Sequence, residues 1–310
     1  MPRFPQERLE VTSRLFHQCL FDSDEGAVAR DFIQNDRHLD PELFRPYEVG
    51  FCPPGILYPD SRELVVEGHM WYMRGRLVFT VRDLSGRIIG FNGRMIPACA
   101  DELWNSLEEQ RGDIAATRLQ DKWLDRKWVN EEFAKGHHLY RLREVHRNLL
   151  ETGAAVLVEG CLDAVVMDIF GITNCVSVLG TTLTPIHEVL LRRFIDHLVF
   201  CFDSDQAGER TRSNLSAAFA DHTPAKGANI SDNVKNYGMS TSAIILREGM
   251  DPELALLDEV ERPLFIHYLR DLCKKKIDRR VVDLGLEQHR VGAMLEIEDG
   301  RRNNESENIG

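Results

Sequence analysis

Long apolar runs are missing from this chain of 310 residues, and none approaches the ~18 residues that span a bilayer. The first five residues contain no hydrophobic signal core. The seven cysteines are scattered and form no C-x-x-C pair, which argues against a zinc ribbon and against a disulfide framework. We therefore expect a protein of the cytoplasm that makes no membrane contact and carries no zinc site.

An excess of positive charge is missing as well, because the net charge is −12. The charge is unevenly spread, however, and residues 74–94 hold five arginines and one acid: Arg74, Arg76, Arg82, Asp83, Arg87 and Arg94. A charged group acts over a Debye length of about 10 Å, so local charge matters more to a polyanion than the total. We expect this stretch to receive phosphates and the acid-rich region after residue 150 to hold cations.

Three kinds of segment precede residue 150. Residues 1–50 have helical spacing of apolar side chains, with a second helix at 27–33 and a short one after Asp40. Residues 77–81 and 87–91 are β-rich and are joined by a turn at 83–86, which predicts a hairpin. Residues 100–126 are polar and are predicted to form a surface helix.

From residue 153 the pattern alternates between strand and helix. Apolar runs at 155–158, 174–178, 198–202 and 243–246 predict strands, and helices are expected at 162–170, 184–197 and 206–220. Strands without a polar face that alternate with helices indicate an α/β fold with a parallel sheet covered on both sides. Residues 221–241 are predicted to form a long loop, and the rest is expected to be helical to about residue 297.

Carboxylates follow two of these strands. Glu159 comes after the first, and Asp203 and Asp205 come after the third. Ligands bind beyond the carboxyl ends of strands in open α/β sheets, and Mg²⁺ prefers carboxylate oxygens. The alternative is that the two aspartates only form a turn and an N-cap. Asp251, which precedes Pro252, is likewise expected to cap a helix.

Together these segments resemble the RNA polymerase domain of DnaG-type primases. Residues 158–163, 177–182 and 202–208 are similar to its TOPRIM motifs, and residues 82–94 to its glycine-rich hairpin. Residues 37–39 and 49–51 resemble its first helical segment, and residues 127–136 its basic linker. The resemblance implies a basic α+β subdomain at 1–150 and a Rossmann-like TOPRIM domain at 151–258. The residue pattern predicts a helical segment at 259–298 and a disordered polar tail at 299–310.

The resemblance also implies the roles of individual residues. Mg²⁺ or Mn²⁺ would be held by Glu159, Asp203, Asp205, Glu248 and Asp251, the first three being catalytic, and Asp163 matches a further acidic position. Template or nucleotide would be contacted by Arg37, Arg94, Lys127, Asn130 and Lys135. Arg74 and Arg76, in the arginine-rich stretch, are further candidates for phosphate contacts. For arginines such as Arg37 and Arg94, the alternative is a solvated surface residue.

The implied activity is the synthesis of RNA primers on single-stranded DNA from ribonucleoside triphosphates during replication. A replicative helicase and a separate zinc-binding module would be partners. A phage-encoded or reduced primase, or an excised core, would fit the pattern. The protein would act in a bacterial or phage-infected cell. Ser204 stands where the family usually has glycine. A TOPRIM nuclease and an inactive DNA-binding replisome adaptor remain as alternatives.

Overall fold

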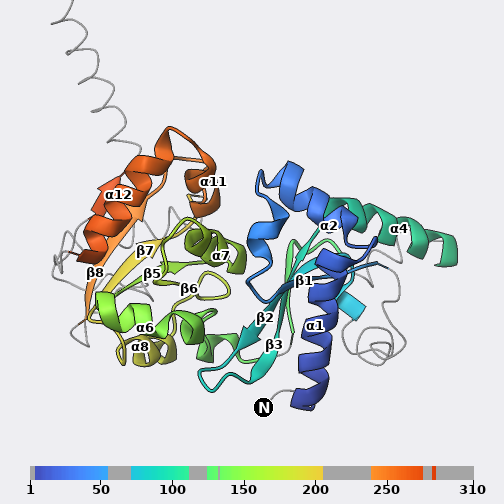
Figure 1. The fold of residues 1–310 in the computed structure, drawn as a ribbon, viewed down its shortest axis with the longest axis horizontal. Helices are drawn as coiled ribbons and strands as arrows, with labels where there is room; N and C mark the ends of the chain where they lie inside the picture. Colours follow the sequence, from blue (N-terminus) through green and yellow to red (C-terminus); the bar gives the residue numbers. More distant parts are fainter. Residues whose placement is uncertain are drawn as a thin grey trace, which may run out of the picture. The chain divides into compact units, whose positions relative to one another are not determined.

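The computed structural model describes residues 4–54, 71–111, 124–131, 133–204, 239–274 and 281–283. The chain divides into two compact units (Figure 1). Unit 1 contains residues 1–135 and 140–143, and unit 2 contains residues 136–139 and 144–310. The finer division of the chain at residues 258 and 298 stays a prediction.

Unit 1 is built on an antiparallel sheet in the order β1 (Val49–Cys52), β2 (Arg76–Arg82), β3 (Ile88–Met95) and β4 (Trp128–Asn130). The predicted hairpin is confirmed, and Asp83 Oδ1 fixes its turn by accepting hydrogen bonds from the backbone N–H groups of Ser85 and Arg87. Two expectations were wrong: residues 49–51 are a strand rather than part of a helical segment, and residues 128–130 are a strand rather than a linker.

Helix α1 (Gln6–Asp22) packs against β1. The predicted second helix begins as α2 (Ala27–Asp31) and widens into the π-helical turn η1 (Phe32–Asp36). The predicted short helix is the 3₁₀ turn η2 (Pro41–Phe44), in which the Asp40 carboxylate accepts a hydrogen bond from the Glu42 N–H. Helix α4 (Pro97–Arg111) covers the first part of the predicted surface helix.

Unit 2 contains a parallel sheet in the order β6 (Cys175–Ser177), β5 (Ala154–Val158), β7 (His197–Cys201), β8 (Ser240–Ile245) and β9 (Val281–Asp283). All residues of β5, β6 and β7 are buried, as expected for strands with apolar side chains on both faces. The helices that the described residues of this unit form are α6 (Leu142–Thr152), α7 (Cys161–Ile169), α8 (Pro185–Leu191), α11 (Pro252–Leu257) and α12 (Glu261–Lys274). The predicted α/β fold is confirmed.

The C-terminal part differs from the expectation of continuous helix. Residues 281–283 form strand β9, which pairs in parallel with β8, whereas α12 contacts β5, β7 and β8. A three-residue strand is too short to produce a readable period. The predicted helix at 206–220, most of the loop at 221–241 and the tail at 299–310 lie outside the described residues. Within the described part of the chain, no helix is long and apolar enough to cross a membrane.

Candidate functional site

Carboxylates gather in unit 2 around the starts of α7 and α11, two helices that contact each other. One oxygen each from Asp163, Asp251 and Glu253 lies within 4.8 Å of the others. The fold fixes two of these side chains: the Asp163 carboxylate accepts a hydrogen bond from the Gly160 N–H (3.1 Å), and Asp251 caps α11 by accepting from the Leu254 N–H (2.8 Å). Glu253 lies in the first turn of α11 with 2% of its surface exposed.

Asp203 interacts electrostatically with the same group of carboxylates. Burial raises the pKa of the Asp163 carboxyl well above its usual value, and the charges of Asp203, Asp251 and Glu253 raise it further, whereas the Gly160 N–H lowers it. We call Asp163, Asp203, Asp251 and Glu253 the acidic cluster. Several carboxylates at this spacing repel one another, and a divalent cation would offset that repulsion. Their oxygens are the donors that Mg²⁺ prefers, so these residues are compatible with such an ion.

Ser204 ties together the two loops that carry Asp203 and Asp251. The Ser204 N–H and hydroxyl both donate to the Met250 carbonyl, at 3.0 and 2.7 Å, and the Met250 N–H donates to the Ser204 hydroxyl oxygen at 2.9 Å. We call this arrangement the Ser204–Met250 clamp. It holds the loop after β7 against the turn before α11, so neither aspartate is carried on an independent loop.

The structure brings together only some of the predicted acidic residues. Asp203, Asp251 and Asp163 lie in the acidic cluster, and the predicted cap at Asp251 is confirmed. Glu248 is exposed and is not among the clustered oxygens, and Glu253, which the sequence analysis missed, takes part instead. The one feature of the sequence that could have indicated Glu253 as a site residue was its position two residues after Asp251.

Glu159 and Asp205 remain less defined. Glu159 is half-buried directly after β5, where its backbone carbonyl accepts hydrogen bonds from the Ser177 hydroxyl (2.6 Å) and the Gly180 N–H (3.2 Å). These contacts fix its backbone at the carboxyl end of the strand. Asp205 lies outside the described residues, and its metal role stays a prediction.

Most arginines of residues 74–94 already have hydrogen-bond or ion-pair partners within unit 1. Arg82 forms ion pairs with Glu10 (2.6 Å) and Glu48 (2.7 Å), and Arg87 pairs with Asp83 (3.1 Å). The resulting hydrogen bonds and charge lower the pKa of the Glu10 carboxyl. Fewer arginines of this stretch are therefore available to bind phosphate than its charge predicts.

Arg76 is a structural residue. Its side chain is fully buried, and its guanidinium donates to the backbone carbonyls of Tyr72 (2.9 Å), Arg126 (2.9 Å) and Lys127 (3.3 Å). Desolvation lowers its pKa to about 10. The predicted template or nucleotide contact is not supported for Arg76, because no part of the side chain reaches the surface.

We expect Arg76→Met to destabilise unit 1 by about 3 kcal/mol, since the carbonyls of Tyr72 and Arg126 lose the donor that the buried guanidinium supplies, while the apolar volume is largely kept. Urea unfolding measures the loss. The matched control is Arg74→Met: Arg74 is half-buried and its Nε has no hydrogen-bond partner, so this change should cost at most about 1 kcal/mol. Equal losses in both variants would contradict the structural role of Arg76.

The remaining basic candidates differ in exposure. Arg94 is 8% exposed, Arg37 and Arg74 are half-buried, and Lys127 and Lys135 are exposed. The pairing of β3 with β4 places Trp128 opposite Arg94, next to Lys127. The Asn130 amide oxygen accepts a hydrogen bond from the Asn92 amide (2.8 Å). For all of these except Arg76, the binding roles stay proposals.

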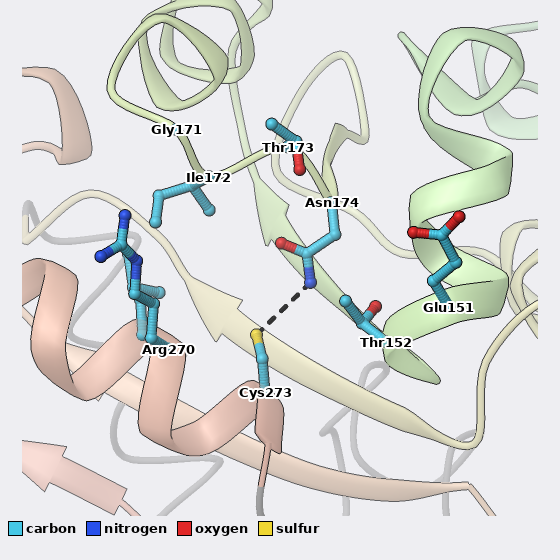
Figure 2. Close-up of a pocket in the computed structure, with 9 residues that line it drawn as sticks. Glu151, Thr152, Gly171, Ile172, Thr173, Asn174, Arg270 and Cys273 are labelled. Carbon is cyan, nitrogen blue, oxygen red and sulfur yellow. Dashed lines mark hydrogen bonds between the residues drawn. The ribbon is translucent and has the colours of Figure 1, made fainter.

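A cavity of about 420 Å³ lies elsewhere in unit 2 (Figure 2). It borders the end of α6, the segment between α7 and β6, and α12. Asn174 donates to the Cys273 sulfur there (3.4 Å). The lining residues are Glu151, Thr152, Gly171, Ile172, Thr173, Asn174, Leu269, Arg270 and Cys273. None of them is a predicted site residue, and the cavity lies where β5 and β6 begin, away from the strand ends that lead to the acids.

Comparison with known proteins agrees with this geometry. Residues 153–226 match the Toprim domain family. The DNA primase of Legionella pneumophila is 27% identical over 253 residues, which cover 76% of this chain and 38% of that protein. The DNA primase of Escherichia coli K12 is 29% identical over 211 residues, covering 62% and 32%. The chain thus spans about a third of the length of these relatives.

Solved structures share the fold. A DnaG catalytic core is 24% identical with a TM-score of 0.59, over 86% of this chain and 79% of that one. A DNA primase domain from Pseudomonas aeruginosa is 24% identical with a TM-score of 0.60, over 86% and 78%. Residues 153–226 thus resemble a Toprim domain, the sequence is similar to that of DNA primases, and the chain shares the fold of a DnaG catalytic core.

Proposed function

We propose that the chain synthesises RNA primers on single-stranded DNA from ribonucleoside triphosphates. The observation that carries this proposal is the acidic cluster within a parallel α/β sheet whose sequence matches a Toprim domain. Support comes from relatives that are DNA primases and from a DnaG primase catalytic domain that was solved bound to single-stranded DNA.

The acidic cluster, together with Glu159 and Asp205, would hold Mg²⁺ or Mn²⁺. A divalent cation there would stabilise the negative charge on the attacking and leaving oxygens of phosphoryl transfer. The Ser204–Met250 clamp keeps Asp203 and Asp251 in place for this role. In unit 1, Arg37, Arg94 and Lys127 would bind phosphate groups of the template or the nucleotide, since arginine and lysine neutralise such oxygens.

One assay tests the proposal against its alternatives. Single-stranded DNA, labelled ribonucleotides and Mg²⁺ or Mn²⁺ are incubated with the protein, and the products are scored for new RNA and for cut DNA. We expect new RNA with intact DNA. Cut DNA without RNA would identify a nuclease, and binding without either product would identify an inactive adaptor. A helicase and a separate zinc-binding module are proposed partners, and adding each to the same assay measures its effect on RNA yield.

A further inference from the structure

Two arginines of unit 1 share one aromatic ring. The guanidinium carbon of Arg37 lies 5.4 Å from the centre of the Phe32 ring, and that of Arg94 lies 5.7 Å from the same centre. The Arg94 guanidinium carbon also lies 5.3 Å from the Trp128 ring. We call Arg37, Phe32, Arg94 and Trp128 the arginine–aromatic row. Its members come from segments far apart in the sequence, so the fold itself assembles it.

Local backbone geometry explains how Arg37 reaches this ring. Phe32 begins the π-helical turn η1, and the Arg37 N–H donates to the Phe32 carbonyl five residues earlier (3.1 Å). Such turns are rare and are frequent at functional sites. On the other side, the register of β3 and β4 places Arg94 opposite Trp128. Each ring attracts the cations through its quadrupole and thereby opposes their mutual repulsion.

The surroundings of Arg94 point to an anion. The side chain is 8% exposed, its Nε has no hydrogen-bond partner, and no acidic side chain of the described residues forms an ion pair with it. Arg45 is the contrasting case, because it lies over the Phe21 ring at 4.6 Å but pairs with Asp22 and Glu42. A nearly buried charge without a counterion is costly, and a bound anion would offset that cost.

We propose that Phe32 is a positioning residue that holds Arg37 and Arg94 as one receptor for a phosphate group. The guanidinium forks match phosphate oxygens, and the shared ring fixes their spacing before the ligand arrives. The phosphate could belong to an incoming triphosphate or to the backbone of single-stranded DNA. This inference deepens the proposed function and rests on it.

The test uses the full chain and measures binding without catalysis. Affinity for a labelled single-stranded oligonucleotide is measured by fluorescence anisotropy, and affinity for inorganic tripolyphosphate by calorimetry, both in EDTA so that the acidic cluster holds no metal. Phe32→Leu should weaken binding of at least one of these ligands about tenfold, because two cation–π contacts are lost. Phe32→Tyr keeps the ring face and should restore binding.

The matched control is Phe21→Leu, since Phe21 is also buried under an arginine that already has acidic partners. Its affinities should equal those of the unaltered chain. In an Arg37→Ala/Arg94→Ala background, Phe32→Leu should cause little further loss, whereas an independent effect of the ring would add in full. Thermal unfolding confirms that each variant is folded at the assay temperature.

Each outcome decides the inference. Loss of tripolyphosphate affinity alone assigns the receptor to the nucleotide, and loss of oligonucleotide affinity alone assigns it to DNA. Unchanged affinity of Phe32→Leu for both ligands, an equal loss in Phe21→Leu, or no recovery in Phe32→Tyr would overturn it. If the unaltered chain makes no RNA but Phe32→Leu still loses phosphate affinity, the receptor stands and the proposed primase function fails.

Discussion

Asp251→Asn is expected to abolish primer synthesis while the chain stays folded. Asparagine caps helices as well as aspartate does, so α11 should keep its first turn. The change removes one negative charge from the acidic cluster and with it a metal ligand, and loss of such a contact removes several kcal/mol of transition-state stabilisation. We expect the rate of RNA synthesis at saturating Mg²⁺ to fall by at least about a hundredfold.

The matched control for this variant is Glu248→Gln. Glu248 lies in the same turn but is exposed and outside the clustered oxygens, so its neutralisation should leave the rate near that of the unaltered chain. Thermal unfolding of both variants separates a folding defect from a chemical one. Near-normal RNA synthesis by Asp251→Asn would refute the metal role of the acidic cluster. A large loss in Glu248→Gln with a small one in Asp251→Asn would restore the original prediction for Glu248.

Gly50→Ala is expected to destabilise unit 1 by about 3 kcal/mol or more, because overpacking against backbone cannot be relieved by a rotamer change. A β-carbon at Gly50 would lie 2.4 Å from the Phe16 carbonyl carbon and 2.6 Å from the His17 nitrogen, both in the backbone of α1. The helix would have to move away from β1, on which it packs. Urea unfolding of the full chain measures the change.

Gly249→Ala is the control for glycine replacement in general. Gly249 has a φ of +80°, but a β-carbon there would meet no atom within 4 Å. Its cost should therefore be limited to left-handed backbone strain of about 1 kcal/mol. A Gly50→Ala chain as stable as the Gly249→Ala chain would show that α1 does not sit as closely on β1 as the structure places it.

The sheet of unit 2 was predictable because the patterns are long and apolar. The runs in β5 and β7 have no polar face, and helices separate them, which restricts the fold to a parallel sheet. Strand β9 was missed because three residues show no periodicity. Strand β4 was missed because Trp128 and Asn130 flank a single buried valine, so its strand character comes from pairing with β3.

The acidic cluster was predicted in part. Asp203 and Asp251 were predicted from strand ends and from the family resemblance; in the structure an Asp251 oxygen lies within 4.8 Å of one from Asp163, and the charge of Asp203 raises the pKa of Asp163. Glu253 looked like an ordinary first-turn acid, because its approach to Asp163 depends on the contact between α7 and α11. The misassigned Arg76 has a similar cause: a sequence shows that a charge is present, but not that backbone carbonyls surround it.

The Ser204–Met250 clamp affects the thermodynamics of cation capture. Ordering the backbone costs about 1–2 kcal/mol of conformational entropy for each residue, and here that loss is incurred when the chain folds. A glycine at position 204 would lack the hydroxyl that accepts from the Met250 N–H and donates to its carbonyl. Capture of an ion by this chain should therefore be accompanied by little loss of loop entropy, and its speed should be set by dehydration of the ion rather than by closure of the two loops around it.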